Sequence, residues 1–333
     1  MLYTRKCGEI ESKDFGSEQT LCGWLQDTRN LGGIAFLQLR DITGVIQLTL
    51  LKKKLETEDF KKWTSINRES IVLVRGIIKE NKEAPGGVEM LPDNLEILNE
   101  AETPLPLGVI DKIYSEIETR LNARYLDLRK KSIAANFQIR AAVSGAVHKH
   151  LRKEKFLEVQ TPKIIASATE GGTSLFEMKY FDKTAYLAQS PQLYKQMLMS
   201  GGLERVYEIG PAFRAEEHNT PRHLNEFISI DIEMSFADDY VIMGVMERLV
   251  DSAARAVAKE TEALETLGMA PIELELPLPR ITYDEAIEMS NGKVEWGEDL
   301  SMEATREIAQ QMNGFYFHYK MAIISETFLH TTR

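Results

Sequence analysis

The chain has 333 residues, a hydrophobic fraction of 43% and a formal net charge of −11. This length is sufficient for two domains with full cores, and the ordinary apolar fraction excludes an intrinsically disordered chain. The negative charge excludes a protein that coats nucleic acid by charge alone, but not one that reads a single-stranded RNA loop by stacking and base edges.

No apolar run approaches the length of a membrane span, and residues 1–15 lack the apolar segment of a signal peptide. The two cysteines, Cys7 and Cys22, do not have the spacing of a metal site and are interpreted as packing residues. A reduced, cytoplasmic location without a membrane partner is therefore predicted.

Five short strands separated by turns are predicted between about residues 19 and 100. A helix at Leu55–Ile66 falls between the third and the fourth strand. This order is typical of the OB-fold, a small Greek-key barrel that binds oligonucleotides, although a β-barrel with no known ligand has the same pattern. The predicted strands are Thr20–Asp27, Ile34–Asp41, Gly44–Leu51, Ser70–Glu80 and Val88–Leu98.

The stiff segment Thr103–Pro106 indicates a linker to a second domain. Helices that pack on a largely antiparallel sheet would make this second domain α+β. Helices are predicted at Ser115–Tyr125, Ile133–Lys155, Gln192–Met199 and Asp239–Thr261. Strands are predicted at Phe156–Val159, which stops at Pro162, and at Leu175–Phe176, Ala185–Ala188, Val206–Glu216 and Phe227–Phe236.

The last two of these strands form a hairpin with the most informative side chains of the chain. Arg214 and Glu216 lie two residues apart, hence on one face of the sheet, and Arg222 and His223 follow in the turn. A guanidinium can hold a phosphate by a forked pair of hydrogen bonds, and a carboxylate can accept from the amine of adenine. The hairpin predicts a nucleoside triphosphate site, with a surface hairpin of solvated ion pairs as the alternative.

Six segments in the right order resemble the class II aminoacyl-tRNA synthetases, specifically the archaeal-type aspartyl-tRNA synthetases. The resemblance spans about Gly23–Phe317 and implies an OB-fold anticodon-binding domain plus a class II catalytic domain with an antiparallel sheet. It implies domain bounds of 1–103 for the barrel, 104–132 for a linker or hinge and 133–317 for the catalytic domain. The segments are GWLQDTRNLGGIAFLQLRD, RYLDLR, FLEVQTPKI, ATEGGTSLF, LAQSPQLYKQML and GPAFRAEEHNTPRHLNEF.

The resemblance implies the roles of the site residues as well. Arg214 would be the catalytic residue, holding the α-phosphate of ATP and the carboxylate of L-aspartate, and Lys195 would face the substrate's side chain. A homodimer interface would form around Pro162. The implied ATP-binding residues are Arg214, Ala215, Glu216, Arg222, His223 and Leu224. The implied aspartate-binding residues are Glu170, Gln192, Leu193, Tyr194, Lys195 and Arg214.

In the barrel, the resemblance implies that Phe36 stacks on an anticodon base and that Gln47 and Glu80 read base edges. Phe36 can equally be a core residue, and the alternation of its strand does not decide. In this family, lysine at one barrel position together with a tryptophan in the first strand goes with strict choice of tRNA. Pro85 and Gln26 stand at these positions, so both tRNA(Asp) and tRNA(Asn) are the predicted partners.

The chain departs from the family after Phe317. The family's third motif, with a second ATP-binding arginine and the acidic Mg²⁺ ligand, is not found, so no metal ligand is expected within this chain and activation should fail. Residues 318–333 are interpreted as a frameshifted tail, because His318–Ala322 can be encoded by codons that, read one base later, give Ile-Thr-Lys-Trp, the continuation that the resemblance implies. The alternatives are a non-catalytic tRNA-binding paralogue and an enzyme strictly specific for tRNA(Asp).

Overall fold

The computed structural model describes residues 2–110, 114–167, 175–215, 224–312 and 315–319. The chain forms two compact units. The first unit consists of Met1–Gly108 with Ser115–Ala123, and the second of Val109–Tyr114 with Arg124–Arg333.

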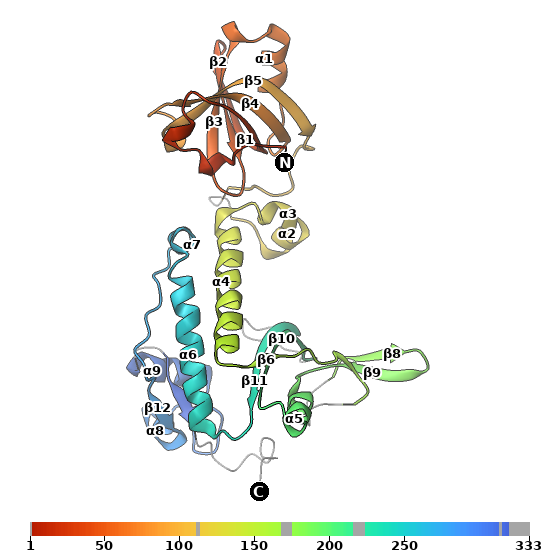
Figure 1. Ribbon diagram of the computed structural model, residues 1–333, viewed down its shortest axis with the longest axis vertical. Helices are drawn as coiled ribbons and strands as arrows, with labels where there is room; N and C mark the ends of the chain where they lie inside the picture. Colours follow the sequence, from red (N-terminus) through yellow and green to blue (C-terminus); the bar gives the residue numbers. More distant parts are fainter. Residues whose placement is uncertain (1, 111–113, 168–174, 216–223, 313–314, 320–333) are drawn as a thin grey trace. The chain divides into compact units, whose positions relative to one another are not determined.

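The first unit is a closed five-stranded barrel, as predicted (Figure 1). Its strands follow one another around the barrel in the order β1-β2-β3-β5-β4, and all neighbours are antiparallel except β3 and β5. The helix α1 (Thr57–Thr64) stands between β3 and β4 in sequence. The strands are β1 (Glu18–Asn30), β2 (Ile34–Arg40), β3 (Val45–Leu51), β4 (Ile71–Glu80) and β5 (Val88–Asn99).

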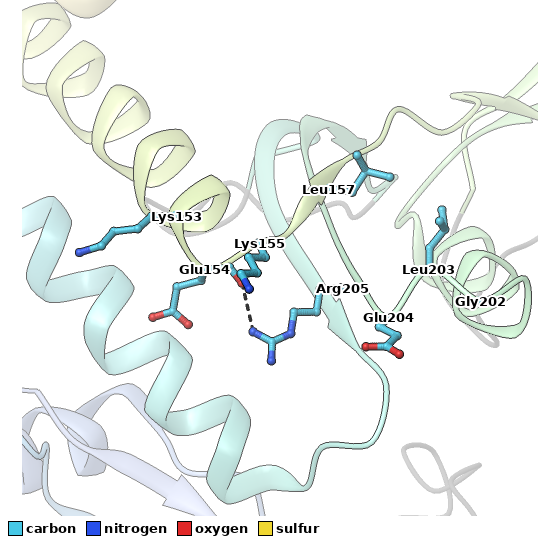
Figure 2. Close-up of a pocket in the computed structure, with 8 residues that line it drawn as sticks. All are labelled: Lys153, Glu154, Lys155, Leu157, Gly202, Leu203, Glu204 and Arg205. Carbon is cyan, nitrogen blue, oxygen red and sulfur yellow. Dashed lines mark hydrogen bonds between the residues drawn. The ribbon is translucent and has the colours of Figure 1, made fainter.

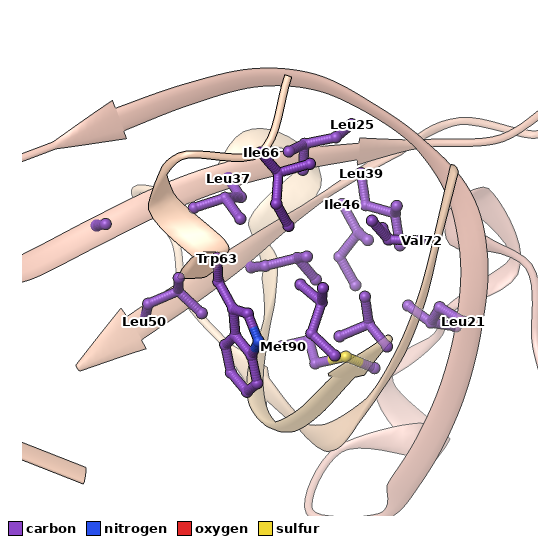
Figure 3. Close-up of a cluster of buried hydrophobic side chains, with 14 of the residues drawn as sticks. Leu21, Leu25, Leu37, Leu39, Ile46, Leu50, Trp63, Ile66, Val72 and Met90 are labelled. Carbon is purple, nitrogen blue, oxygen red and sulfur yellow. The ribbon is translucent and has the colours of Figure 1, made fainter. Parts of the chain in front are cut away.

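The barrel is filled by aliphatic side chains, with Trp63 of α1 packed among them (Figure 3). Ala35, Leu37 and Leu39 alternate along β2 and are all buried in this core. Because successive side chains of a strand point to opposite faces, Phe36 lies on the outer face of β2. The alternative that Phe36 is a core residue is therefore wrong.

The second unit is built on a three-stranded sheet in the order β11-β10-β6. The central strand is antiparallel to β11 and parallel to β6. Two helices cover one face of this sheet, and their contact is centred on Tyr207, Leu151 and Leu249, all buried. The elements are α4 (Lys131–Lys153), β6 (Leu157–Glu158), β10 (Arg205–Phe213), β11 (Glu226–Met234) and α6 (Asp239–Val257).

Before β10 the chain forms a smaller sheet in the order β7-β9-β8 and then the helix α5. Their bounds are β7 (Ile164–Ile165), β8 (Glu177–Tyr180), β9 (Lys183–Leu187) and α5 (Gln192–Ser200). The single helix predicted at Ser115–Tyr125 is wrong. The structure has α2 (Ile117–Asn122) and α3 (Arg124–Asp127), because Ala123 between them leaves the helical region at φ −112° and ψ 40°.

Beyond α6, which ends at Val257 instead of the predicted Thr261, lie elements that the sequence did not predict. β12 and β13 pair in parallel, and β13 includes His318, the first residue of the segment interpreted as frameshifted. Residues 320–333 of that segment are outside the described part. The elements are α7 (Thr261–Leu267), β12 (Arg280–Thr282), α8 (Tyr283–Met289), α9 (Met302–Gln311) and β13 (Phe317–Tyr319). No helix in the described ranges has the length and apolarity to cross a membrane.

Candidate active site

One face of the β10–β11 hairpin carries the polar residues of the candidate site. Tyr207 packs toward α4 and α6, so its neighbour Glu208 points to the opposite face. The antiparallel register places Glu208 opposite Asp231 and Ala212 opposite Phe227. Paired residues share a face, so these side chains line one surface of the hairpin, away from the two helices.

Arg214 follows the last residue of β10 and continues its pairing with β11. Its backbone N–H donates to the carbonyl of Asn225 at 2.9 Å, and its carbonyl accepts from Asn225 Nδ2 at 2.9 Å. Its exposed guanidinium lies over the ring of Phe227, 5.6 Å from the ring centre. The cation–π contact and the two backbone bonds orient the guanidinium at the edge of the polar face.

Lys195 is a buried cation on the same face, with only 3% of its surface exposed. Its Nζ lies 3.3 Å from Asp231 Oδ1, 3.5 Å from Glu233 Oε2 and 3.4 Å from the carbonyl of Ile232. All three distances exceed the roughly 2.7–2.9 Å of a strong charge-assisted hydrogen bond. The ammonium is therefore compensated in charge but held loosely, which leaves it able to form a shorter bond with another carboxylate.

α5 brings a second predicted residue to this cluster. Gln192 begins the helix, and its Nε2 donates to Glu233 Oε2 at 3.4 Å. Gln192 and Lys195 are three residues apart and hence on one face of the helix. Leu193 is 48% exposed and Tyr194 is half-buried, and neither has a described polar contact to the cluster.

The remaining predicted residues have different outcomes. Ala215 is half-buried directly after Arg214, Leu224 is 66% exposed before β11, and Pro162 is exposed between β6 and β7. The predicted residues that lie outside the described part of the chain are Glu170, Glu216, Arg222 and His223.

Three acidic residues of the face were not predicted as site residues, namely Glu208, Asp231 and Glu233. Glu208 is 3% exposed and accepts hydrogen bonds from the backbone N–H and the hydroxyl of Thr161, at 3.0 and 2.7 Å. Lys163 Nζ lies 2.9 Å from Glu208 Oε1. The alternation of acidic and isoleucine residues in β11 is the signal that points to the polar face.

The opposite face of the sheet holds a separate polar group. Tyr207 donates its hydroxyl to Glu158 Oε2 at 3.0 Å, and Arg152 Nη2 lies 2.7 Å from the same oxygen. The hydrogen bonds from Arg152 and Tyr207 lower the pKa of the Glu158 carboxyl below its usual value. Glu158 is thus an ion-paired carboxylate close in sequence to Thr161 but directed away from the candidate site.

On the barrel, Phe36 and Gln47 line one open hollow of about 810 Å³. Glu80, exposed at the end of β4, is not among the described residues that line it, and neither are Gln26 and Pro85. Gln26 lies at a bulge of β1, where its Oε1 accepts from Arg40 Nη1 at 3.3 Å.

Glu89 is a residue of this hollow that the sequence did not identify. Its Oε2 accepts from Thr49 Oγ1 at 2.6 Å and from Asn81 Nδ2 at 2.9 Å, and Gln47 Nε2 lies 3.5 Å away. Because the NH₂ group of Gln47 is turned toward Glu89 and Thr49, its side-chain carbonyl is the atom left to accept a further hydrogen bond. Only the parallel pairing of β3 with β5, which sets Glu89 beside Gln47, reveals this contact.

A further hollow of about 660 Å³ lies at the start of β10, at the opposite end of the strand from Arg214 (Figure 2). Arg205 donates from Nη1 to the carbonyl of Glu154 at 3.0 Å there. Both basic and acidic side chains line it, namely Lys153, Lys155 and Arg205 with Glu154 and Glu204, so its lining does not indicate a ligand of one charge. Among the described residues, no three His, Cys, Asp or Glu side chains gather as metal ligands.

The sequence matches two families of known proteins. Residues 116–329 match the tRNA synthetases class II (D, K and N), and residues 19–98 match the OB-fold nucleic acid binding domain. The first match extends past Phe317 into the segment interpreted as frameshifted.

Curated relatives from archaea are similar over most of the chain. The aspartate–tRNA(Asp/Asn) ligase of Archaeoglobus fulgidus is 51% identical over 315 residues, which cover 93% of this chain and 73% of the relative. The enzyme of the same name from Methanopyrus kandleri is 50% identical with the same coverage. The aspartate–tRNA(Asp) ligase of Thermoplasma acidophilum is 47% identical, covering 92% of this chain and 72% of the relative.

Solved structures show the same architecture. Asparaginyl-tRNA synthetase from Pyrococcus horikoshii with asparaginyl-adenylate superposes with a TM-score of 0.89 at 33% identity, covering 96% of this chain and 75% of that one. Aspartyl tRNA synthetase from Entamoeba histolytica superposes with a TM-score of 0.83 at 29% identity, covering 97% and 72%.

Proposed function

This chain belongs to the class II tRNA synthetases of the D, K and N group, and from that premise we propose that it is an aspartate–tRNA ligase. It joins L-aspartate to tRNA(Asp) and tRNA(Asn) with ATP as the co-substrate. The names of the relatives at about 50% identity support this activity.

The burial of Lys195 and the length of its contacts are the observation that supports aspartate as the substrate. The side chain is buried, and its three contacts are 3.3–3.5 Å long. A carboxylate of the substrate gains a short, charge-assisted bond to this ammonium, whereas the neutral amide of asparagine gains much less. The ammonium of the substrate, in turn, suits the carboxylates of Asp231 and Glu233, which the structure places around Lys195.

Arg214 supplies the chemistry of the first step. The α-carboxylate of aspartate attacks the α-phosphate of ATP, pyrophosphate leaves, and aspartyl-adenylate remains. Both reactants are anions, so the residues act by positioning them and by neutralising charge. The guanidinium over Phe227 stands at the edge of the face that holds Lys195, where it can hold the carboxylate and the phosphate together. Magnesium, the counter-ion of ATP, neutralises phosphate charge when bound, and the described residues gather no set of ligands for it.

In the second step the terminal ribose hydroxyl of the tRNA attacks the carbonyl of the aspartyl group, an ester forms, and AMP leaves. The anticodon is read in the barrel hollow, where Phe36 stacks on a base and the carbonyl of Gln47 accepts from a base edge.

The proposal also includes a homodimer with its interface around Pro162 and a cytoplasmic location. The dimer is supported by exposed apolar residues on either side of Pro162, namely Leu157 and Ile164.

Calorimetric titration with two non-hydrolysable adenylate analogues tests the substrate. Aspartyl sulfamoyl adenosine is expected to bind at least about a hundredfold more tightly than its asparaginyl counterpart, because only the former has a carboxylate for Lys195. Aspartate-dependent pyrophosphate exchange, measured on the same preparation, tests activation. A chain that binds neither analogue, or that prefers the asparaginyl one, does not have the proposed function.

The choice of tRNA is tested separately by filter binding of tRNA(Asp) and tRNA(Asn) transcripts. The unaltered chain is expected to bind both with dissociation constants that differ by less than about tenfold. The double variant Gln26→Trp with Pro85→Lys should bind tRNA(Asn) about tenfold more weakly and tRNA(Asp) unchanged. Tryptophan and lysine at these two positions are the residues that go with strict choice of tRNA in the family that the chain resembles. Binding of tRNA(Asp) alone by the unaltered chain would instead establish the strictly specific enzyme.

A further inference from the structure

Glu208 is a buried carboxylate that the proposed mechanism does not use. The register of β10 and β11 sets it directly opposite Asp231, on the face that also carries Glu233. Like charges opposite each other on a sheet repel and destabilise the pairing.

Each of the two opposing carboxylates has its own lysine. Lys163 Nζ lies 2.9 Å from Glu208 Oε1, and Lys195 Nζ lies 3.3 Å from Asp231 Oδ1. The shorter pair is further fixed by Thr161, whose backbone N–H and hydroxyl both donate to Glu208. The face therefore carries two lysines, Lys163 and Lys195, and the three carboxylates of Glu208, Asp231 and Glu233. Because Lys163 is bound to Glu208, the cation beside Asp231 and Glu233 is Lys195.

Gly210, the next residue of β10 on this face, leaves room for the conformation of Glu208. A Cβ atom at position 210 would lie 3.2 Å from Glu208 Oε1, closer than nearly all such contacts. The Glu208 carboxylate is thus held by Thr161 and Lys163 and occupies space that a side chain at position 210 would take. The arrangement fixes the position of one negative charge next to the candidate aspartate pocket.

We propose that Glu208 and Lys163 are positioning residues for aspartate recognition. This inference rests on the proposed function and deepens it. Glu208 holds the ammonium of Lys163 away from Asp231, so that Asp231 stays with Lys195 and the loose contacts of Lys195 remain available to the substrate. Without the charge of Glu208, the ammonium of Lys163 pairs instead with Asp231, on the opposite strand, and draws this carboxylate away from Lys195. Lys163 then also competes with Lys195 for the carboxylate of the substrate.

The test is a double-mutant cycle read by calorimetric titration of the full chain with aspartyl sulfamoyl adenosine and, separately, with ATP. Glu208→Gln is expected to weaken binding of the analogue about tenfold, the effect of one charged hydrogen bond, with ATP affinity unchanged. Adding Lys163→Met to Glu208→Gln removes the lysine that has lost its partner. The double variant is expected to bind the analogue within about threefold of the affinity of the unaltered chain. A residue needed only for folding gives no such recovery.

Glu158→Gln is the matched control, because Glu158 is an ion-paired carboxylate near Thr161 that faces the other side of the sheet. It is expected to leave the affinity for the analogue unchanged. An equal loss of analogue and ATP affinity in Glu208→Gln, or a double variant no better than the single one, overturns the positioning role. If the unaltered chain does not bind the analogue, the proposed function falls as well; if it binds and Glu208→Gln binds equally, only the positioning role falls.

Discussion

Replacement of Lys195 by methionine is expected to weaken binding of aspartyl sulfamoyl adenosine by about a hundredfold or more. The variant removes the only cation within 4.0 Å of Asp231 or Glu233 among the described residues. Truncation of one partner of a buried, hydrogen-bonded charge pair costs about 2–5 kcal/mol, and the lower part of this range applies because the side chains of Asp231 and Glu233 are 20% and 25% exposed. Preference for the aspartyl over the asparaginyl analogue should disappear in the same variant, since both side chains then meet a methionine.

A loss of folding would also abolish binding, so a second buried lysine serves as the control. Lys130 is 5% exposed, and its Nζ lies 3.5 Å from Asp127 Oδ1. Lys130→Met is expected to lower the unfolding temperature as Lys195→Met does, yet to bind the analogue like the unaltered chain. Equal affinities of the two variants would show that Lys195 has no direct part in recognising aspartate.

Arg214→Ala is the second change with a large expected effect. Without the guanidinium, nothing described at the end of β10 neutralises the charge that develops as carboxylate and phosphate approach each other. Removal of a single stabilising donor of this kind lowers the rate about 10²–10³-fold. Where the unaltered chain supports aspartate-dependent pyrophosphate exchange, this rate should fall by that factor, and the affinity for ATP should fall in any case. The unfolding temperature should fall only slightly, because the side chain is exposed and loses one cation–π contact.

The same strand offers a matched arginine. Arg205 begins β10 and lies over the ring of Phe156 at 5.9 Å, as Arg214 lies over Phe227 at the other end. Arg205→Ala removes a comparable cation–π contact far along the strand from the candidate site. It should reduce stability slightly and leave exchange intact. Exchange that survives in Arg214→Ala but not in Arg205→Ala would contradict the assignment.

The barrel was predictable because its signals are local. The strands alternate buried and less buried residues, glycines stand in the turns at Gly32-Gly33, Gly44 and Gly86-Gly87, and the helix between the third and fourth strands matches the order typical of the OB-fold. The side of the barrel wall on which Phe36 lies was not predictable, since a half-buried aromatic residue fits either side of a barrel strand. The burial of its neighbours Ala35 and Leu37 in the barrel core places Phe36 on the outer side. Glu89 escaped notice because its partner, Gln47, is 42 residues away in a parallel pair.

In the second unit, the sequence predicted residues of the candidate site but not the side chains that they contact. The alternation of β11 predicts that Asp231 and Glu233 share a polar face, but that Lys195 meets them depends on how α5 packs against the sheet. β12 and β13, three residues each, carry too little periodicity to be recognised, and their parallel pairing joins distant parts of the chain. Glu170 and Glu216 remain predictions.

The closed barrel has a consequence for the order in which the two units fold during synthesis of the chain. The last of the five barrel strands ends at Asn99, and β1 completes the closure by pairing with β4. The barrel can therefore fold on the ribosome as soon as its last strand emerges. The sheet of the second unit must wait longer, because β6 at Leu157 pairs with β10, which begins at Arg205. Pulse-labelling of stalled nascent chains should detect a protease-resistant barrel before any resistant fragment of the second unit.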